Sequence, residues 1–262
     1  MEYRLKRQVS IATIFFIVLL LVLFFIFSKE KEVPSCFDGA LNQDEEQIDC
    51  GGAFCVSCLE FYFEDTQILS SDFLLFEESY DVIARVKNTN SQHGTDDLVY
   101  NFKFYDKYNN FLKEEKGKSY ILAGETKYIA KSNLEVEGEP AFVKFEVEPV
   151  TWKEQRRTSI KLPIFSKKYE SIITSGAPGT SQATGVVENQ TNYSFVDVDL
   201  VAILFNDKDE KIAINHSRIN NLRSGERRAL IIPWFSELEN GPVNKVIIEA
   251  YADAIDDSNI LK

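Results

Sequence analysis

The sequence has little of the material that most enzymes use for acid–base or nucleophilic chemistry. It holds 2 histidines in 262 residues, and both His93 and His216 stand in polar, loop-like stretches where a surface imidazole is expected. It contains no G-x-S-x-G elbow, no phosphate-binding glycine loop and no H-E-x-x-H helix. We therefore expect a protein that is not an enzyme.

Basic residues are also scarce. The chain has 29 Lys and Arg against 41 Asp and Glu, a net charge of -12, whereas nucleic-acid binders are typically basic. At 44% apolar and 27% charged residues it is too hydrophobic for a disordered protein. These numbers predict a folded, acidic protein with no nucleic-acid partner.

Charge is absent from residues 9–27, where nearly every side chain is apolar. As a helix rising 1.5 Å per residue, this segment is long enough to cross a bilayer. Because three basic residues precede it, we predict a single-pass transmembrane helix with residues 1–8 in the cytoplasm. A cleaved signal peptide is the alternative, although the run exceeds its usual length of about 7 to 15 residues. The chain beyond a spacer at residues 28–35 is then expected outside the cytoplasm.

All the cysteines fall in a Cys-rich module at residues 36–58, and no other part of the chain contains one. They are Cys36, Cys50, Cys55 and Cys58. A Cys₄ zinc site and two disulfides are the competing interpretations. An oxidising compartment and the lack of two C-x-x-C knuckles favour disulfides. A bridge between Cys55 and Cys58 would close a strained short loop, so we expect each of them to bond either Cys36 or Cys50.

The same module carries a cluster of oxygen ligands and no Lys or Arg. The candidate Ca²⁺ ligands are Asp38, Asn42, Asp44, Glu45 and Asp49. Hard oxygen ligands at short spacing suit Ca²⁺ in an extracellular setting, but the run does not follow the alternating ligand positions of an EF-hand loop. A solvated acidic loop without a bound cation is the alternative.

Beyond Leu59 the chain is rich in Val, Ile, Phe and Tyr with alternating polarity, which is typical of half-buried antiparallel strands. An internal repeat appears at a shift of about one hundred residues, the size of an immunoglobulin-like sandwich. The matching segments are Ala84–Asn88 with Gly185–Asn189, Leu98–Phe104 with Val198–Leu204, and Gly124-Glu125 with Gly225-Glu226. The repeat predicts one sandwich at residues 59–155 and a second at residues 156–262.

Two segments resemble known families. The pattern C-x-D-G-x-x-N-x-x-E-x-x-x-D-C-G-G-x-x-C-x-x-C at residues 36–58 resembles Cys-rich segments that follow the anchor in envelope proteins of uncultured small-genome bacteria. Residues 102–106, Phe-Lys-Phe-Tyr-Asp, resemble the FxLYD motif, with Phe104 at the Leu position, and residues 202–206 are a more degenerate copy. The resemblance implies extracytoplasmic β-sandwiches, with Asp106 or Asn206 opening a turn after the strand.

The sequence therefore predicts a mainly β protein with one N-terminal transmembrane α-helix, a small disulfide-stapled Cys-rich segment and two immunoglobulin-like antiparallel β-sandwiches. We expect a bacterial cell-membrane protein that binds or scaffolds in the envelope. Its partners would be the lipid bilayer, through residues 9–27, and an unknown envelope protein or polymer. A Ca²⁺-responsive adhesion or structural protein is the second hypothesis, and an accessory subunit of a secretion or pilus-type assembly is the third.

Overall fold

The structure is a computed structural model of the chain, and it divides into two compact units, Met1–Tyr62 and Phe63–Lys262. The residues that it describes are 8, 13, 15–20, 36, 41–42, 44–46, 48, 50–55, 63–76, 78–157, 160–172, 179–238 and 241–261.

The N-terminal unit holds the predicted membrane anchor. Gln8, Thr13 and Phe15–Leu20 are helical. Within the described residues, no helix is long and apolar enough to cross a membrane. Most of the predicted anchor at residues 9–27, and all but one residue of its cytoplasmic flank at residues 1–8, lie outside the described residues. The transmembrane helix and the spacer at residues 28–35 therefore stay predictions.

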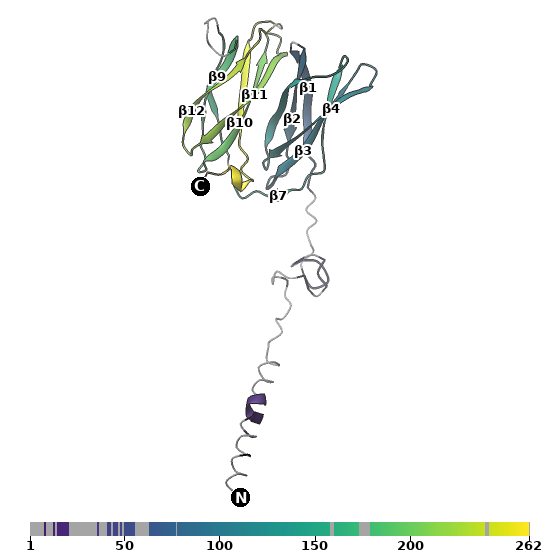
Figure 1. The fold of residues 1–262 in the computed structure, drawn as a ribbon, viewed down its shortest axis with the longest axis vertical. Helices are drawn as coiled ribbons and strands as arrows, with labels where there is room; N and C mark the ends of the chain where they lie inside the picture. The colour runs from purple at the N-terminus through teal and green to yellow at the C-terminus, as the bar shows by residue number, and fades with distance from the viewer. Residues whose placement is uncertain are drawn as a thin grey trace. The chain divides into compact units, whose positions relative to one another are not determined.

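The C-terminal unit is mainly β, as the alternating polarity predicts, and its described sheets are antiparallel (Figure 1). The strands of the first sequence copy are β1 (Gln67–Phe76), β2 (Ser79–Lys87), β3 (His93–Tyr105), β4 (Phe111–Ile121), β5 (Thr126–Leu134), β6 (Phe142–Val147) and β7 (Lys153–Glu154). Those of the second copy are β8 (Ile164–Ser171), β9 (Ser181–Glu188), β10 (Phe195–Phe205), β11 (Lys211–Leu222), β12 (Arg227–Trp234) and β13 (Lys245–Tyr251), followed by the 3-10 helix η1 (Asp257–Asn259).

Each copy builds two sheets from its own strands. In the first copy, the first outer sheet has the order β4-β3-β6, with β7 also paired to β3, and the first inner sheet has the order β1-β2-β5. In the second copy, the second inner sheet is β11-β10-β13 and the second outer sheet is β12-β9-β8. We call these two sheet pairs the first and the second sandwich.

The inner sheets of the two sandwiches pack face to face, because β11 contacts β1, β2 and β5 (Figure 1). Successive side chains of β2 point to opposite faces of its sheet. Val82 and Ala84 pack in the core of the first sandwich. Ile83 points the other way, is 2% exposed, and packs in the apolar cluster formed mainly by buried residues of the second sandwich. Lys211 Nζ adds an ion pair across the junction, 2.9 Å from Asp72 Oδ2. The two sandwiches thus share one apolar interface.

Alternate positions of β3 and β10 are buried, as the alternating polarity predicts, but half-burial is wrong for β10. The positions Leu98, Tyr100, Phe102 and Phe104, and their counterparts Val198, Leu200, Ala202 and Leu204, are all buried. Val201, Ile203 and Phe205, on the opposite face of β10, are buried too. The reason is that this face carries the interface with the first sandwich, so β10 has no solvent side along this stretch.

Matching residues of the repeat make matching contacts. Asn88 and Asn189, each directly after a strand, are both 0% exposed. The Asn88 amide donates to Leu122 O at 2.9 Å, and the Asn189 amide donates to Leu222 O at 3.3 Å. The Oδ1 of each accepts the backbone N–H two residues further on. Each asparagine therefore satisfies buried backbone groups that would otherwise lack a partner.

The repeated Gly-Glu pair also has a common geometry. Gly124 and Gly225 have φ values of +67° and +72°, a conformation that glycine adopts without strain. The carbonyls of the following residues, Glu125 and Glu226, accept the N–H groups of Asn88 and Asn189, both at 2.9 Å. The turn predicted after the FxLYD-like strand is present in both copies, because Asp106 Oδ1 and Asn206 Oδ1 each accept two backbone N–H groups of the following turn.

A buried charge lies at the edge of the interface. Lys127 is 3% exposed, and its Nζ donates to Tyr120 O at 3.1 Å and lies 3.4 Å from the centroid of the Tyr120 ring. Burial lowers the pKa of Lys127, and the negative charge of Glu125 opposes this effect. The ring of Tyr251, from the second sandwich, is 5.1 Å from the same Nζ, and its hydroxyl accepts the N–H of Tyr128 at 3.0 Å. Polar contacts therefore join the sandwiches as well.

Candidate functional site

The structure brings two of the predicted cysteines together. Cys36 and Cys55 form a disulfide, and Cys50 is also disulfide-bonded. This confirms disulfides over zinc for the described cysteines, and it confirms that Cys55 bonds either Cys36 or Cys50. Cys58 lies outside the described residues, so its bond stays a prediction.

The described acidic residues of the module serve its turns. Asp44 Oδ2 accepts the N–H of Ala53 at 2.6 Å, and Glu45 Oε2 accepts the N–H of Asn42 at 3.2 Å. Glu45 Oε1 also lies 3.4 Å from Cys55 Sγ. Ligand atoms of Cys36, Glu45 and Cys55 come within 4.8 Å of one another, but disulfide sulfurs are not the thiolates that bind metal ions.

Only some of the predicted Ca²⁺ ligands of the module are among the described residues. Asp38 and Asp49 lie outside the described residues, so the complete set of oxygen ligands is not described. Ca²⁺ binding therefore stays a prediction, and so does the alternative, a solvated acidic loop without a bound cation.

A larger polar site lies where the two sandwiches meet. A cleft of about 390 Å³ opens between β3 and β4 of the first sandwich and β10, β11 and η1 of the second. Its charged lining residues are Asp96, Lys118, Asp197, Asp199, Arg218, Asp253 and Asp256. We call this site the acidic cleft.

The second sandwich supplies one wall from the outward face of β10. Asp197 and Asp199 continue the row of alternate positions that becomes apolar at Val201 and packs in the interface. Arg218, opposite Asp199 on β11, pairs with both carboxylates, with Nε 3.0 Å from Asp199 Oδ1 and Nη1 3.3 Å from Asp197 Oδ2. The nearby negative charge of Asp199 raises the pKa of Arg218. This guanidinium stays charged and holds both carboxylates.

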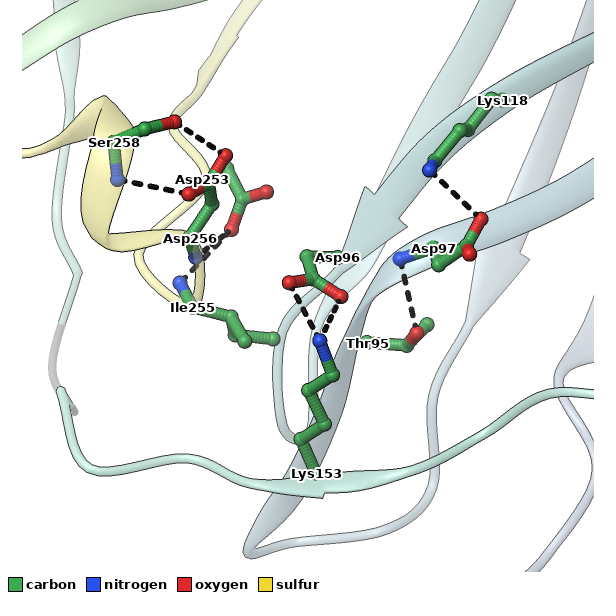
Figure 2. Close-up of polar contacts among 9 residues, drawn as sticks. All are labelled: Thr95, Asp96, Asp97, Lys118, Lys153, Asp253, Ile255, Asp256 and Ser258. Atoms are coloured by element: carbon green, nitrogen blue, oxygen red, sulfur yellow. Dashed lines mark hydrogen bonds and ion pairs between the residues drawn. The ribbon is translucent and has the colours of Figure 1, made fainter.

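The first sandwich supplies the opposite wall (Figure 2). Lys153, in the segment that leads to the second sandwich, places Nζ 2.6 Å and 2.8 Å from the two oxygens of Asp96. Lys118 Nζ lies 3.1 Å from Asp97 Oδ1. Gly94 allows close packing beside this wall, because a Cβ there would lie 2.6 Å from Ile255 Cδ1 of the second sandwich.

The C-terminal segment supplies two further carboxylates (Figure 2). Asp253 Oδ1 accepts the N–H groups of Ile255 and Asp256, at 2.8 Å and 3.1 Å. Burial raises the pKa of Asp253 in spite of these hydrogen bonds, and the charges of Asp256 and Asp96 raise it further. Asp256 caps η1 by accepting the hydroxyl and the N–H of Ser258, which lowers its pKa.

Asn259 fixes this segment to β10. Its side chain accepts the N–H of Asp197 at 2.8 Å and donates to the carbonyls of Asp197 and Asp253 at 3.1 Å and 3.0 Å. The two carboxylates of the C-terminal segment are thus held at a defined place relative to the β10 wall.

Tyr120 completes the lining. The residue is 8% exposed, and its hydroxyl oxygen has no hydrogen-bond partner among the described residues. Burial raises the pKa of Tyr120 well above its ordinary value, and the negative charge of Asp199, also on the cleft wall, is the next largest cause. The phenol is therefore a neutral group that can both donate and accept a hydrogen bond.

Chemically, the acidic cleft is suited to holding positive charge. Its lining holds no histidine or cysteine among the described residues. The expectation that both histidines lie in loop-like stretches is wrong, because His93 begins β3 and His216 lies within β11. His216 is exposed within its strand, and a local sequence pattern does not distinguish an exposed strand position from a loop.

Comparison with known proteins does not identify the chain. No family model and no curated protein matches it. Among solved structures, a crystal structure of red sea bream transglutaminase matches with 11% sequence identity and a TM-score of 0.22. The match covers 73% of this chain and 30% of that chain. A likeness at this level carries no argument about fold or function.

Proposed function

We propose that this protein is a membrane-anchored, extracytoplasmic binding or scaffolding protein of the cell envelope, without catalytic activity. The observation that carries the proposal is the acidic cleft at the junction of two sandwiches that share an apolar interface. A shared interface keeps the two walls of the cleft at a fixed spacing, which is what a recognition surface requires.

The fold and anchor belong to the same proposal. We assign the two sandwiches, at residues 59–155 and 156–262, to the immunoglobulin-like class with FxLYD-type strands. The matching Asn and Gly-Glu contacts of the two copies support this assignment. The charge-free segment at residues 9–27 and its basic flank support an anchor with the sandwiches outside the cytoplasm.

Site-specific photo-crosslinking in intact cells tests the binding function. A photo-reactive amino acid replaces Lys118, whose side chain at the cleft is 64% exposed. The matched control replaces Lys168, an exposed lysine on β8 of the second outer sheet. We expect an envelope component to be crosslinked from position 118 and not from position 168. Equal crosslinking from both positions, or none from either, would contradict a binding role for the cleft.

Protease added to intact cells or spheroplasts tests the anchor. It should digest the sandwiches while residues 1–8 stay protected. Full protection of the sandwiches would reverse the orientation.

A further inference from the structure

The outer sheets leave large apolar side chains exposed at the two ends of the stack of four sheets (Figure 1). We call the outward face of β4-β3-β6 the first outer face and the outward face of β12-β9-β8 the second outer face. On β12, Leu230 and Ile232 are buried in the core, whereas Ile231 points outward and is 56% exposed. On β8, Phe165 is 40% exposed, and on β4, Phe111 is 56% exposed. Clustered apolar groups on a surface mark an interaction site.

The first outer face carries a row of three aromatic side chains. Phe111 and Phe142 both lie opposite Tyr105 in the register of the sheet. The ring of Tyr105 is 6.0 Å from that of Phe111, and it stacks on that of Phe142 at 5.2 Å. Further along this face, Lys103 Nζ lies 2.6 Å from Glu146 Oε2, so these two charges neutralise each other. The face therefore offers a cluster of rings beside an internally paired charge.

The internal repeat shows what covers faces of these two kinds. The second outer sheet is the counterpart of the first inner sheet, because Gly185–Asn189 of β9 matches Ala84–Asn88 of β2. The first outer sheet is the counterpart of the second inner sheet, because Leu98–Phe104 of β3 matches Val198–Leu204 of β10. Inside the molecule, the two inner sheets pack on each other. The two outer faces are thus the same pair of faces, and no described part of the chain joins them.

Equivalent rows of the repeat keep their apolar content. In the internal interface, Ile83 lies opposite Ala130. In the second outer face, the counterparts are Thr184 and Ile231, which also lie opposite each other. The isoleucine stands on the other strand of the pair, yet each row retains one. The row that is buried against a sheet in the first copy therefore keeps a large apolar side chain in the second copy, where it is exposed.

The ion pair of the internal interface also has a compatible counterpart. Inside the molecule, Lys211 pairs with Asp72. By strand register, Phe111 takes the place of Lys211, and Lys168 takes the place of Asp72. Two outer faces that pack as the inner sheets do would bring Lys168 against an aromatic ring, which attracts a cation. A lysine at both places would instead be repulsive.

We propose that a second copy of this chain covers these faces, with the second outer face of one molecule packed on the first outer face of the next. A contact between two different faces is head-to-tail, and it builds rings or open rows of molecules. The proposed contact does not involve the acidic cleft and goes beyond the proposed function.

Sedimentation velocity of the full-length protein in a non-ionic detergent tests this self-association. Phe111→Lys blocks the first outer face, and Ile231→Lys blocks the second. Leu75→Lys is the matched control, because Leu75 is 54% exposed and lies on β1 of the first inner sheet, outside both faces. Thermal melting of each variant checks that it folds, since all three substituted side chains are exposed.

We expect the parent to form dimers and longer assemblies as its concentration rises. Each blocked variant alone should associate at least about tenfold more weakly, because a lysine would be buried in an apolar contact. An equal mixture of the two blocked variants should recover a dimer and nothing longer, since together they retain one intact pair of faces. Leu75→Lys should associate within about twofold of the parent.

Three results would overturn the proposal. A dimer that survives in one blocked variant, and that mixing does not restore in the other, would show a contact between identical faces. Equal assembly of the parent and both blocked variants would place the contact in the anchor or elsewhere in the chain. A parent that stays monomeric up to about 1 mM would show that the faces do not bind each other.

The photo-crosslinking experiment keeps this proposal separate from the binding role of the cleft. Lys168 lies on the second outer face, so the product expected from position 168 is a second copy of this chain. The product expected from position 118 is a different envelope component. Capture from position 118 without a homodimer from position 168 overturns self-association alone, and the reverse result overturns the binding role of the cleft alone.

Discussion

The substitution Ile83→Ala tests whether the two sandwiches share an interface. Ile83 is 2% exposed, although its side chain points away from the core of its own sandwich. The change removes three carbon atoms, at about 0.8 kcal/mol each for transfer to water, and leaves a cavity. We expect the free energy of unfolding to fall by about 3 kcal/mol.

Urea denaturation followed by tryptophan fluorescence measures this loss. Val82→Ala, which truncates the adjacent side chain in the core of the first sandwich, is the positive control, with an expected loss of about 2 kcal/mol. Leu75→Ala, at a position that is 54% exposed, should cost less than about 0.5 kcal/mol. If Ile83→Ala behaves like Leu75→Ala, the inner sheet faces solvent and the reasoning is refuted.

Three further predictions follow from the described contacts. Asn88→Ala and Asn189→Ala should each lower the free energy of unfolding by about 2 to 4 kcal/mol, because each leaves several buried backbone groups without partners; thermal melts of both variants check this. Asp253 has a raised pKa in the folded state, so its contribution to stability is greatest below the ordinary Asp range and is lost as the pH rises through the raised value. Asp253→Asn should therefore gain stability relative to the parent as the pH rises above about 4, and a difference that stays constant with pH would contradict the assignment. Millimolar Ca²⁺ should leave the melting temperature of the full chain unchanged if Asp44 and Glu45 only cap turns, whereas a rise would support the Ca²⁺-responsive hypothesis.

Sequence alternation was sufficient to place the cores of the sandwiches. Period two placed Leu98 and Phe102 inward, and the repeat carried the same assignment to Val198 and Ala202. The turn after β3 could also be predicted from the sequence, because an Asp directly after a strand accepts N–H groups of the next turn. These features depend on residues close together in the sequence, which is why a single sequence predicts them.

The interface required the tertiary structure, although the sequence held a signal for it. Residues 201–205 are apolar without interruption, which is typical of a strand covered on both faces. Alternation in β3, carried over to its counterpart β10, predicts half-burial for that strand too. What covers the second face of β10 is another sheet, and no local pattern specifies which one.

The acidic cleft could not be predicted from sequence for a related reason. Asp96, Asp199 and Asp253 lie far apart in the chain and meet only because the two inner sheets pack together. In an acidic chain, isolated aspartates look like ordinary surface residues. The Tyr120 hydroxyl is likewise distinguished only by its burial, since its position in the sequence resembles that of any strand tyrosine.

Differential scanning calorimetry of the full-length protein tests most directly whether the two sandwiches form one unit that holds the cleft. With a shared apolar interface, residues 63–262 should unfold in a single transition, with a ratio of calorimetric to van't Hoff enthalpy of about 1. Two separable transitions, one for each sandwich, would show that the cleft walls are not held together and would contradict the account.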